Sequence, residues 1–131
     1  MATVEVTKDN LQKLIDESDV LILDFWASWC GPCMQFAPTF EEASEKHPNI
    51  VFGKVDTESQ QELAGAFNIR AIPTLMVFRE QVMLLNQSGA LPPPVFQKLI
   101  TQVLEIDMEE VHAEIEKAKA AEESGESGDD A

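Results

Sequence analysis

The sequence predicts an α/β fold in which a mixed central β-sheet is flanked by helices on both faces. Segments with strand patterning alternate with segments of helical periodicity along most of the 131 residues. The segment Val20–Trp26 is almost entirely apolar, which is typical of a central strand covered on both faces. Two later strand patterns, residues 74–78 and 82–87, are separated by only three residues and therefore predict an antiparallel hairpin.

The residues before the central strand predict an edge strand followed by a short helix. Residues 3–6 alternate in polarity and are few, as in an edge strand. Residues 9–17 place their leucines and isoleucine on one helical face, and Thr7 or Asp9 is the expected N-cap. Both elements are expected to precede the central strand in the same domain.

A long helix and a further strand follow the central strand. Residues 32–46 read as a helix that begins with Pro32 in its first turn, where the missing N–H costs nothing. Pro38 falls inside this helix and is expected to kink it. Residues 50–56 predict the next strand of the sheet.

Two more helices complete the predicted domain. Residues 59–67 predict a short helix with Ser59 as its cap and Glu62 at the capping-box position. Residues 92–104 predict a closing helix. The residues of this closing helix that are expected to face inward are Phe96, Leu99, Ile100 and Val103.

The predicted α/β domain covers residues 1–104, and the sequence changes character after it. Residues 105–121 predict an amphipathic helical extension, because apolar residues recur there at spacings of three and four. Residues 122–131 have no apolar residue except the final alanine and predict a disordered acidic tail. The apolar seam of the extension consists of Leu104, Met108, Val111, Ile115 and Ala118.

The formal net charge of −15 is concentrated near the C-terminus. Residues 105–131 carry 11 acidic and 2 basic residues, whereas the other 104 residues carry 13 acidic and 7 basic ones. An acidic chain without a basic stripe has no electrostatic attraction for phosphate groups. The charge distribution therefore argues against nucleic acid and anionic membranes as partners.

The N-terminal pattern and the cysteine count predict a compartment. The opening residues show no basic segment followed by an apolar run, and no apolar stretch approaches the roughly 20 residues of a membrane span. The chain has only two cysteines, too few to staple a secreted mini-protein. We therefore expect a soluble, cytoplasmic protein whose cysteine pair has a chemical role.

That cysteine pair, Cys30 and Cys33, lies where the central strand gives way to the long helix. Unpaired N–H groups and the dipole at a helix N-terminus favour a thiolate, which is the nucleophile of disulfide exchange. A second cysteine three residues later can close a small ring and expel the attacked group. The alternative is half of a zinc site. A closed site needs four ligands, and only His47 and His112 remain as further histidine or cysteine ligands, so we expect no metal.

The run DFWASWCGPC, together with IPT at residues 72–74, resembles the thioredoxin family over residues 3–104. The resemblance implies a thioredoxin fold and a protein-disulfide reductase that acts in cell redox homeostasis on disulfide-containing client proteins. It implies no bound cofactor other than the redox-active Cys30–Cys33 disulfide. Electrons would come from NADPH through a flavoprotein, thioredoxin reductase.

The resemblance also assigns catalytic roles. Cys30, at the start of the helix, is the expected nucleophile and the more exposed cysteine, and Cys33 is the resolving thiol. Asp24 resembles the family's buried aspartate, which relays a proton to or from that thiol. Burial without partners is expected to raise the pKa of its carboxyl group. Lys54 resembles the lysine that stays near this carboxylate. The alternatives are an Asp24 turned outward at a strand edge and a Lys54 that extends to solvent.

A flat apolar patch around Cys30 is the expected client-binding surface, and Pro73 is its expected cis-proline. Met34 departs from the family, because many members carry a basic residue directly after the second cysteine. Losing that charge is expected to weaken thiolate stabilisation slightly and to alter partner choice. The expected client-binding residues are Trp29, Gly31, Pro32, Ala71, Ile72, Pro73, Gly89 and Ala90.

A second hypothesis comes from a different functional class. The apolar patch and the extension would also suit a binding or co-chaperone module, and the seam of the extension would suit self-association. The intact cysteine pair favours the enzyme, since a pure binding domain needs neither cysteine. A helix packed back onto its own domain explains the seam at least as well.

Overall fold

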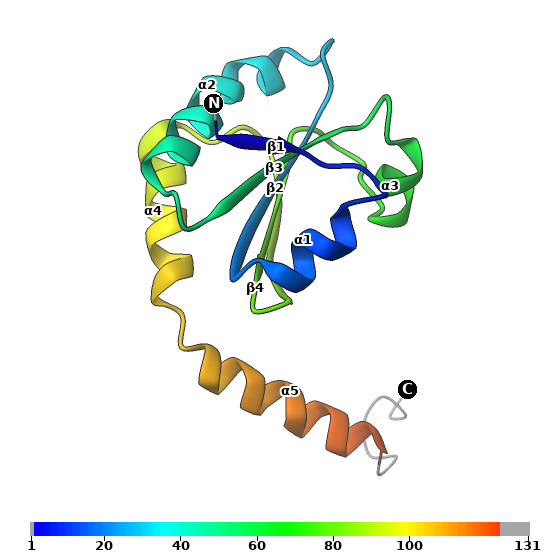
Figure 1. Ribbon diagram of the computed structural model, residues 1–131, viewed down its shortest axis with the longest axis vertical. Helices are drawn as coiled ribbons and strands as arrows, with labels where there is room; N and C mark the ends of the chain where they lie inside the picture. The colour runs from blue at the N-terminus through cyan, green and yellow to red at the C-terminus, as the bar shows by residue number, and fades with distance from the viewer. Residues whose placement is uncertain (1, 124–131) are drawn as a thin grey trace. The chain divides into compact units, whose positions relative to one another are not determined.

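Five strands form one mixed sheet in the computed structural model, which describes residues 2–123 (Figure 1). The sheet order is β1-β3-β2-β4-β5, in which β1, β3 and β2 are parallel. Strand β4 runs antiparallel to β2, and β5 runs antiparallel to β4. The predicted mixed α/β architecture is confirmed. Residues 124–131, which include most of the predicted acidic tail, lie outside the described residues.

The order of elements along the chain is the predicted one. The chain divides into two units, Met1–Ile100 and Thr101–Ala131, and α4 spans the division. The elements are β1 (Thr3–Glu5), α1 (Leu11–Glu17), β2 (Val20–Trp26), α2 (Gly31–Lys46), β3 (Val51–Asp56), α3 (Gln61–Ala66), β4 (Thr74–Arg79), β5 (Val82–Ser88), α4 (Pro93–Glu105) and α5 (Met108–Glu123).

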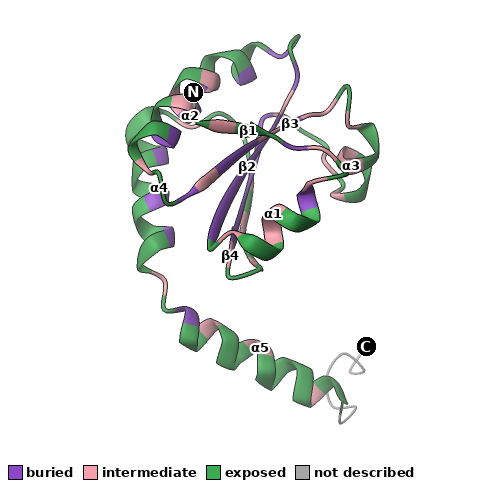
Figure 2. Ribbon diagram, in the orientation of Figure 1, coloured by how far each residue is buried: buried purple, intermediate pink, exposed green. Residues whose placement is uncertain are grey.

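Strand β2 is central and is buried along almost its whole length, from Val20 to Phe25 (Figure 2). Its apolar sequence leaves no face suited to water, so it is covered on both sides as predicted. In the register of the sheet, Asp24 of β2 lies opposite Lys54 of β3 and Leu75 of β4. The carboxyl group of Asp24 is therefore attached to the backbone in the middle of the sheet.

The hairpin between β4 and β5 turns through Glu80 and Gln81, which have φ angles of 51° and 71°. Two positive φ angles at the centre of a two-residue connection define a type I′ turn, whose twist matches that of the flanking strands. The sequence predicted a three-residue connection because neither residue is the glycine or asparagine that usually signals this turn.

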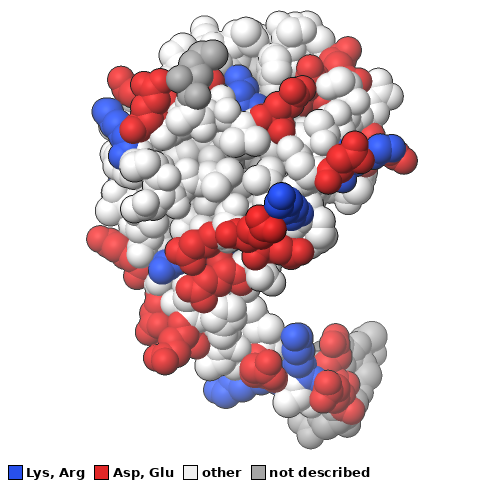
Figure 3. Space-filling model, in the orientation of Figure 1, with Lys and Arg blue, Asp and Glu red and all other residues white. Residues whose placement is uncertain are grey.

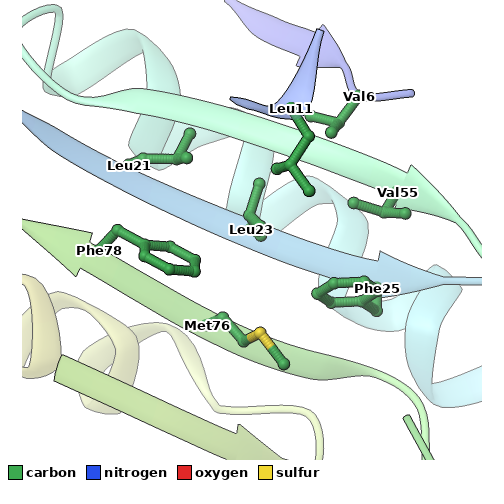
Figure 4. Packing of buried hydrophobic residues seen from close by; sticks show 8 residues of the cluster. All are labelled: Val6, Leu11, Leu21, Leu23, Phe25, Val55, Met76 and Phe78. Carbon is green, nitrogen blue, oxygen red and sulfur yellow. The ribbon is translucent and has the colours of Figure 1, made fainter. Parts of the chain in front are cut away.

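One face of the sheet packs against α1 and α3. Figure 4 shows side chains of β2 and β4, among them Leu23, Phe25 and Met76, gathered beside Leu11 of α1. The half-buried Leu63 of α3 and Phe67 pack against the same cluster. Apolar residues of both helices thus pack in this core. Ile69 and Ile72 of the loop before β4 pack against the same cluster, which holds that loop in place.

The opposite face is filled by an aromatic cluster. Phe40 of α2 lies edge-on to Phe52 of β3, with ring centroids 5.3 Å apart. Phe36 of α2 lies edge-on to Phe96 of α4 at 5.2 Å. Edge-to-face pairs of this kind add about 0.5–1.5 kcal/mol each beyond the area they bury. They fix α2, and with it the cysteine pair, against the sheet.

The predicted side-chain caps of α1 and α3 are wrong. Helix α1 begins after Asn10, which makes no side-chain capping bond, and Thr7 instead accepts a hydrogen bond from the N–H of Asp9 outside the helix. Helix α3 begins after Gln60, again without a side-chain cap, so Ser59 lies one residue too early. Short polar side chains bond equally well within the preceding turn, and sequence does not distinguish the two uses.

The long helix is as predicted within one residue at its start, and Pro38 lies inside it. In the closing helix, Phe96, Ile100 and Val103 are buried as predicted, whereas Leu99 is only half-buried. Within residues 2–123 no helix is both long enough and apolar enough to cross a membrane.

The second unit contains the amphipathic helix α5. Met108 at its start is buried, and Val111 and Ile115 of the predicted seam are half-buried. Helix α5 extends to Glu123, two residues beyond the predicted end of the helical extension. Its polar positions carry six acidic and two basic residues.

Gly53 in β3 occupies a position where a side chain has no room. A Cβ atom there would lie 2.5 Å from Cγ2 of Val6 and 3.0 Å from Cδ2 of Leu23. Both neighbours are fully buried, so they cannot move aside without disturbing the core. We predict that Gly53→Ala lowers the free energy of unfolding by about 1–3 kcal/mol, measured by urea unfolding.

Gly65 in α3 provides the matched control, because a Cβ atom there meets nothing within 4 Å. Gly65→Ala is expected to stabilise the fold by about 0.5 kcal/mol through helix propensity. Equal stability of the Gly53→Ala protein and the unmodified protein would contradict the close packing between β3 and its neighbours.

Candidate active site

The cysteine pair lies at the junction of β2 and α2. Cys30 is the N-cap residue of α2, with extended backbone angles, and its N–H donates to the carbonyl of Ala27 at 3.2 Å. The N–H of Cys33 points back at Sγ of Cys30 at 3.2 Å. A donor of the first helical turn is therefore already directed at the sulfur that would carry a negative charge after reduction.

Cys30 and Cys33 form a disulfide, with Cα atoms 5.2 Å apart. Cys30 is 5% exposed and Cys33 only 1%, so solvent and partners reach Cys30 first. Ala27 is buried with the two cysteines, and the half-buried Trp26 and Ile72 pack against them. The disulfide thus has largely apolar surroundings.

The loop before β4 faces the disulfide. The carbonyl oxygen of Ile72 lies 3.7 Å from Sγ of Cys30, and the Ile72–Pro73 peptide bond is cis. Thr74, a buried residue that the sequence analysis did not single out, donates its hydroxyl hydrogen to the carbonyl of Ala71. This bond holds the loop in shape next to the sulfur.

A second backbone segment is tied to the same loop. The N–H of Gly89 donates to the carbonyl of Pro73 at 2.8 Å. Gly89 has a φ angle of +106°, which residues with a side chain rarely adopt, so glycine is required at this position. The predicted residues Pro73 and Gly89 are thereby brought together, with the exposed Ala90 directly after them.

Trp29 is 68% exposed beside the cysteines, and its Nε1–H donates to the carboxylate of Glu58 at 2.9 Å. Sequence reasoning missed Glu58. A signal existed, because β2 and β3 are parallel and the residues following both strands must meet at one edge of the sheet. The indole is therefore held in a fixed orientation although most of it faces solvent.

A shallow groove of about 200 Å³ runs beside Trp29. It brings three predicted residues, Trp29, Ala71 and Ile72, together with residues that the sequence did not indicate. The full lining is Trp29, Thr57, Ala64, Ile69, Arg70, Ala71 and Ile72.

The remaining predicted client-binding residues, Gly31 and Pro32, are exposed in the first turn of α2. Met34, the residue directly after Cys33, is 48% exposed. Its side chain, which the sequence analysis contrasted with a basic residue expected from the resemblance, is therefore accessible from solvent.

Asp24 is completely buried, and neither carboxylate oxygen has a hydrogen-bond partner in the described chain. Desolvation by this burial raises its pKa to about 7, although the charge of Lys54 partly opposes the shift. The outward-facing alternative for Asp24 is excluded. Lys54 lies opposite Asp24 in the sheet register, and its Nζ is 4.6 Å from the ring centroid of Trp26.

A metal centre would need a cluster of ligands. Across residues 2–123, no group of three or more His, Cys, Asp or Glu side chains is arranged to hold a metal ion. The chemistry supported by the described site is that of the two sulfurs, and the strand that leads to them, β2, contains one buried carboxyl group of raised pKa, Asp24.

Comparison with known proteins agrees with this geometry. The thioredoxin family model matches residues 2–105. "Putative thioredoxin 2" of Streptomyces coelicolor is 49% identical over 119 residues, which are 91% of this chain and 89% of that protein. A match of that length within 131 residues must include at least part of α5.

More distant relatives and solved structures point the same way. "Thioredoxin C-3" of Corynebacterium nephridii is 38% identical over 78% of this chain and 71% of its own length. The structure of Plasmodium falciparum thioredoxin superposes with a TM-score of 0.71 at 32% identity, covering 76% of this chain and 98% of that chain.

A disulfide-forming cysteine pair at the N-terminus of a helix that follows a central strand is the site of a thiol-disulfide oxidoreductase. With the family model and these relatives, the chain belongs to the thioredoxin family. Its fold and its redox-active cysteine pair are those the sequence predicted.

The raised pKa of Asp24 makes stability depend on pH. Because the folded state keeps a proton that the unfolded state releases above its pKa of 3.8, the free energy of unfolding falls as pH rises from about 4 to about 7. The loss is up to roughly 4 kcal/mol and is complete above pH 7. We predict that Asp24→Asn removes most of this loss, measured by urea unfolding of the oxidised protein at about pH 4 and about pH 8.

The control is Asp9→Asn, which removes an exposed carboxylate. It should leave the pH dependence of the unmodified protein intact. If Asp24→Asn unfolds with the same pH dependence as the Asp9→Asn protein, Asp24 is not the buried proton-binding group.

Proposed function

We propose that the chain reduces disulfides of client proteins, with Cys30 as the nucleophile and Cys33 as the resolving thiol. The observation that carries the assignment is the 3.2 Å approach of the Cys33 N–H to Sγ of Cys30. That donor and the N-terminus of α2 stabilise negative charge on Cys30. The higher exposure of Cys30 supports the same order of attack.

The proposed reaction has two exchange steps. The Cys30 thiolate attacks one sulfur of the client disulfide, which forms a mixed disulfide and releases the other client sulfur as a thiolate. Cys33, once deprotonated, attacks Sγ of Cys30 and releases the second client sulfur. The client gains two electrons, and the chain ends in the Cys30–Cys33 disulfide that the model contains.

Asp24 is proposed to accept the proton that Cys33 loses in the second step, directly or through water. A carboxyl group with a pKa of about 7 can both take and return a proton near neutral pH, whereas an exposed aspartate would stay ionised. Lys54 is proposed to limit how far burial raises that pKa, since its charge favours the carboxylate.

Clients are proposed to bind over the apolar surface next to Cys30. The exposed Trp29 and the groove beside it support this role, as does the backbone segment around Pro73. The proposed client-binding residues are Trp29, Gly31, Pro32, Ala71, Ile72, Pro73, Gly89 and Ala90.

We further propose that a thioredoxin reductase returns electrons from NADPH to the Cys30–Cys33 disulfide. Each catalytic cycle leaves the pair oxidised, so an external reductant is required for turnover. A reducing compartment such as the cytoplasm suits this cycle, because there the pair is re-reduced rather than stored as a structural disulfide.

The catalytic domain is proposed to end near residue 104, with residues 105–121 as an extension of separate use and residues 122–131 as a tail. Self-association through the α5 seam is the use we propose for that extension. Its half-buried apolar residues support the proposal, whereas its excess of acidic residues opposes close pairing of two copies.

The first test couples NADPH oxidation to insulin reduction through a thioredoxin reductase. Cys30→Ser and Cys33→Ser should each abolish turnover, because one removes the nucleophile and the other the resolving thiol. Only Cys33→Ser is expected to accumulate a stable mixed disulfide with the client, detected by non-reducing electrophoresis and mass spectrometry. Accumulation in the Cys30→Ser protein instead would reverse the assigned roles.

A second test removes residues 106–131 and leaves α4 complete. All the proposed catalytic and client-binding residues remain, so kcat/KM for insulin should stay within a few-fold of the full chain. Sedimentation velocity of the two proteins measures whether the removed segment mediates self-association. A large loss of activity in a truncated chain that retains its circular dichroism spectrum would place part of the active unit in the extension.

A further inference from the structure

A second groove lies at the N-terminal end of α4, on the α2 side of the active site. Its volume is about 280 Å³. The groove described above beside Trp29 shares none of its residues. Its lining consists of Gln35, Phe36 and Thr39 from α2 and of Ala90, Leu91, Pro92 and Pro93 from the segment that leads into α4.

Both walls of this second groove begin a few residues along the chain from the segments that carry or face the disulfide. Gln35 begins one wall only two residues after Cys33 in α2. Ala90 begins the other wall directly after Gly89, whose N–H is bonded to the carbonyl of Pro73. A client chain that reaches Cys30 past Pro73 therefore has this groove within a few residues of its attacked cysteine.

The groove is held in shape before any client arrives. The carbonyl of Pro92 accepts hydrogen bonds from the N–H groups of Val95 and Phe96, both at 3.0 Å, which ties the proline segment to the start of α4. The ring of Phe36, which is 2% exposed, is fixed edge-on against Phe96. A preformed groove lowers the entropy lost when a side chain binds.

The chemistry of the lining is neutral and mainly apolar. None of the seven residues ionises, although the chain as a whole has a net charge of −15 and Figure 3 shows many acidic side chains on the face it draws. Pro92 and Pro93 expose ring carbons and have no N–H to offer. The only polar side chains are the Gln35 amide and the Thr39 hydroxyl.

Size and chemistry together select the occupant. The volume of the groove lies at the lower limit of small-molecule sites, about 300 Å³, and is large enough for a single side chain. A charged side chain would lose hydration without gaining an oppositely charged partner from the lining. An aromatic ring offers a flat apolar surface to the proline rings, and a tyrosine hydroxyl or an indole N–H can bond the Gln35 amide.

We propose that this groove is a specificity subsite that takes an aromatic side chain of the client, a few residues from the attacked cysteine. The proposal rests on the disulfide-reductase function proposed above and adds a substrate preference to it. Clients with an aromatic residue at the matching position are reduced faster than otherwise identical clients with an acidic one.

The test uses peptides whose single cysteine is disulfide-bonded to a chromogenic thiol of low pKa. The Cys30 thiolate then attacks the sulfur of the peptide cysteine, because the chromogenic thiol, which has the lower pKa, is the better leaving group. Tyrosine, aspartate or lysine is placed at each of about four positions on either side of the cysteine, a reach of roughly 13 Å of extended chain. We expect kcat/KM to be about tenfold higher for tyrosine than for aspartate at one position, equivalent to about 1.4 kcal/mol.

Charge variants of Gln35 locate the preference. Gln35→Lys should raise the ratio of kcat/KM for the aspartate peptide to kcat/KM for the tyrosine peptide about tenfold. Gln35→Glu should raise the corresponding ratio of the lysine peptide to the tyrosine peptide about tenfold. Any effect of a substitution that is common to both peptides cancels in these ratios. The matched control is Gln12→Lys, which makes the same charge change at an exposed position of α1 and should leave the ratio unchanged.

The outcomes separate the two proposals. If all peptides are reduced but tyrosine has no advantage at any position, or if Gln35→Lys and Gln12→Lys give the same ratio, the subsite is overturned and the reductase proposal stands. If no peptide is reduced by the dithiol form of the chain, the reductase proposal fails and the subsite fails with it.

Discussion

The structure depends on one junction, where the buried strand β2 ends and α2 begins at the cysteine pair. Because β2 is covered on both faces, its end is fixed in position, and the aromatic cluster of Phe36, Phe40 and their partners fixes α2 in turn. In the disulfide form, the N–H of Cys33 consequently points at Sγ of Cys30. The fold thus supplies a preformed stabiliser of negative charge, which is what disulfide exchange requires.

Burial of Asp24 in the same core lowers the stability of the fold. A buried carboxyl group without a hydrogen-bond partner reduces stability whenever it must ionise, and an apolar residue would fit the surrounding strand better. A pKa of about 7 suits a group that takes and returns a proton near neutral pH. The presence of Asp24 in the central strand is therefore understandable as a compromise between stability and the proposed proton transfer from Cys33.

Two kinds of surface meet at the cysteine pair. On one side, the exposed Trp29 is held by Glu58 above a shallow groove. On the other side, α2 and the proline segment before α4 enclose a second groove without charged side chains. Both linings are free of acidic side chains although the chain is strongly acidic, which suits the proposed binding of apolar client segments, and the overall charge opposes non-specific association.

The sequence alone determined the order of elements, the central position of β2 and the cysteine chemistry, because apolar periodicity and the CGPC spacing are local signals. The resemblance to the thioredoxin family supplied the cis bond at Pro73. Only the tertiary structure decided the bond between Trp29 and Glu58, the capping of the short helices and both grooves. The bond and the grooves join residues that are distant along the chain, which no local pattern encodes. The capping depends on which of several competing local hydrogen bonds forms, and sequence does not distinguish them.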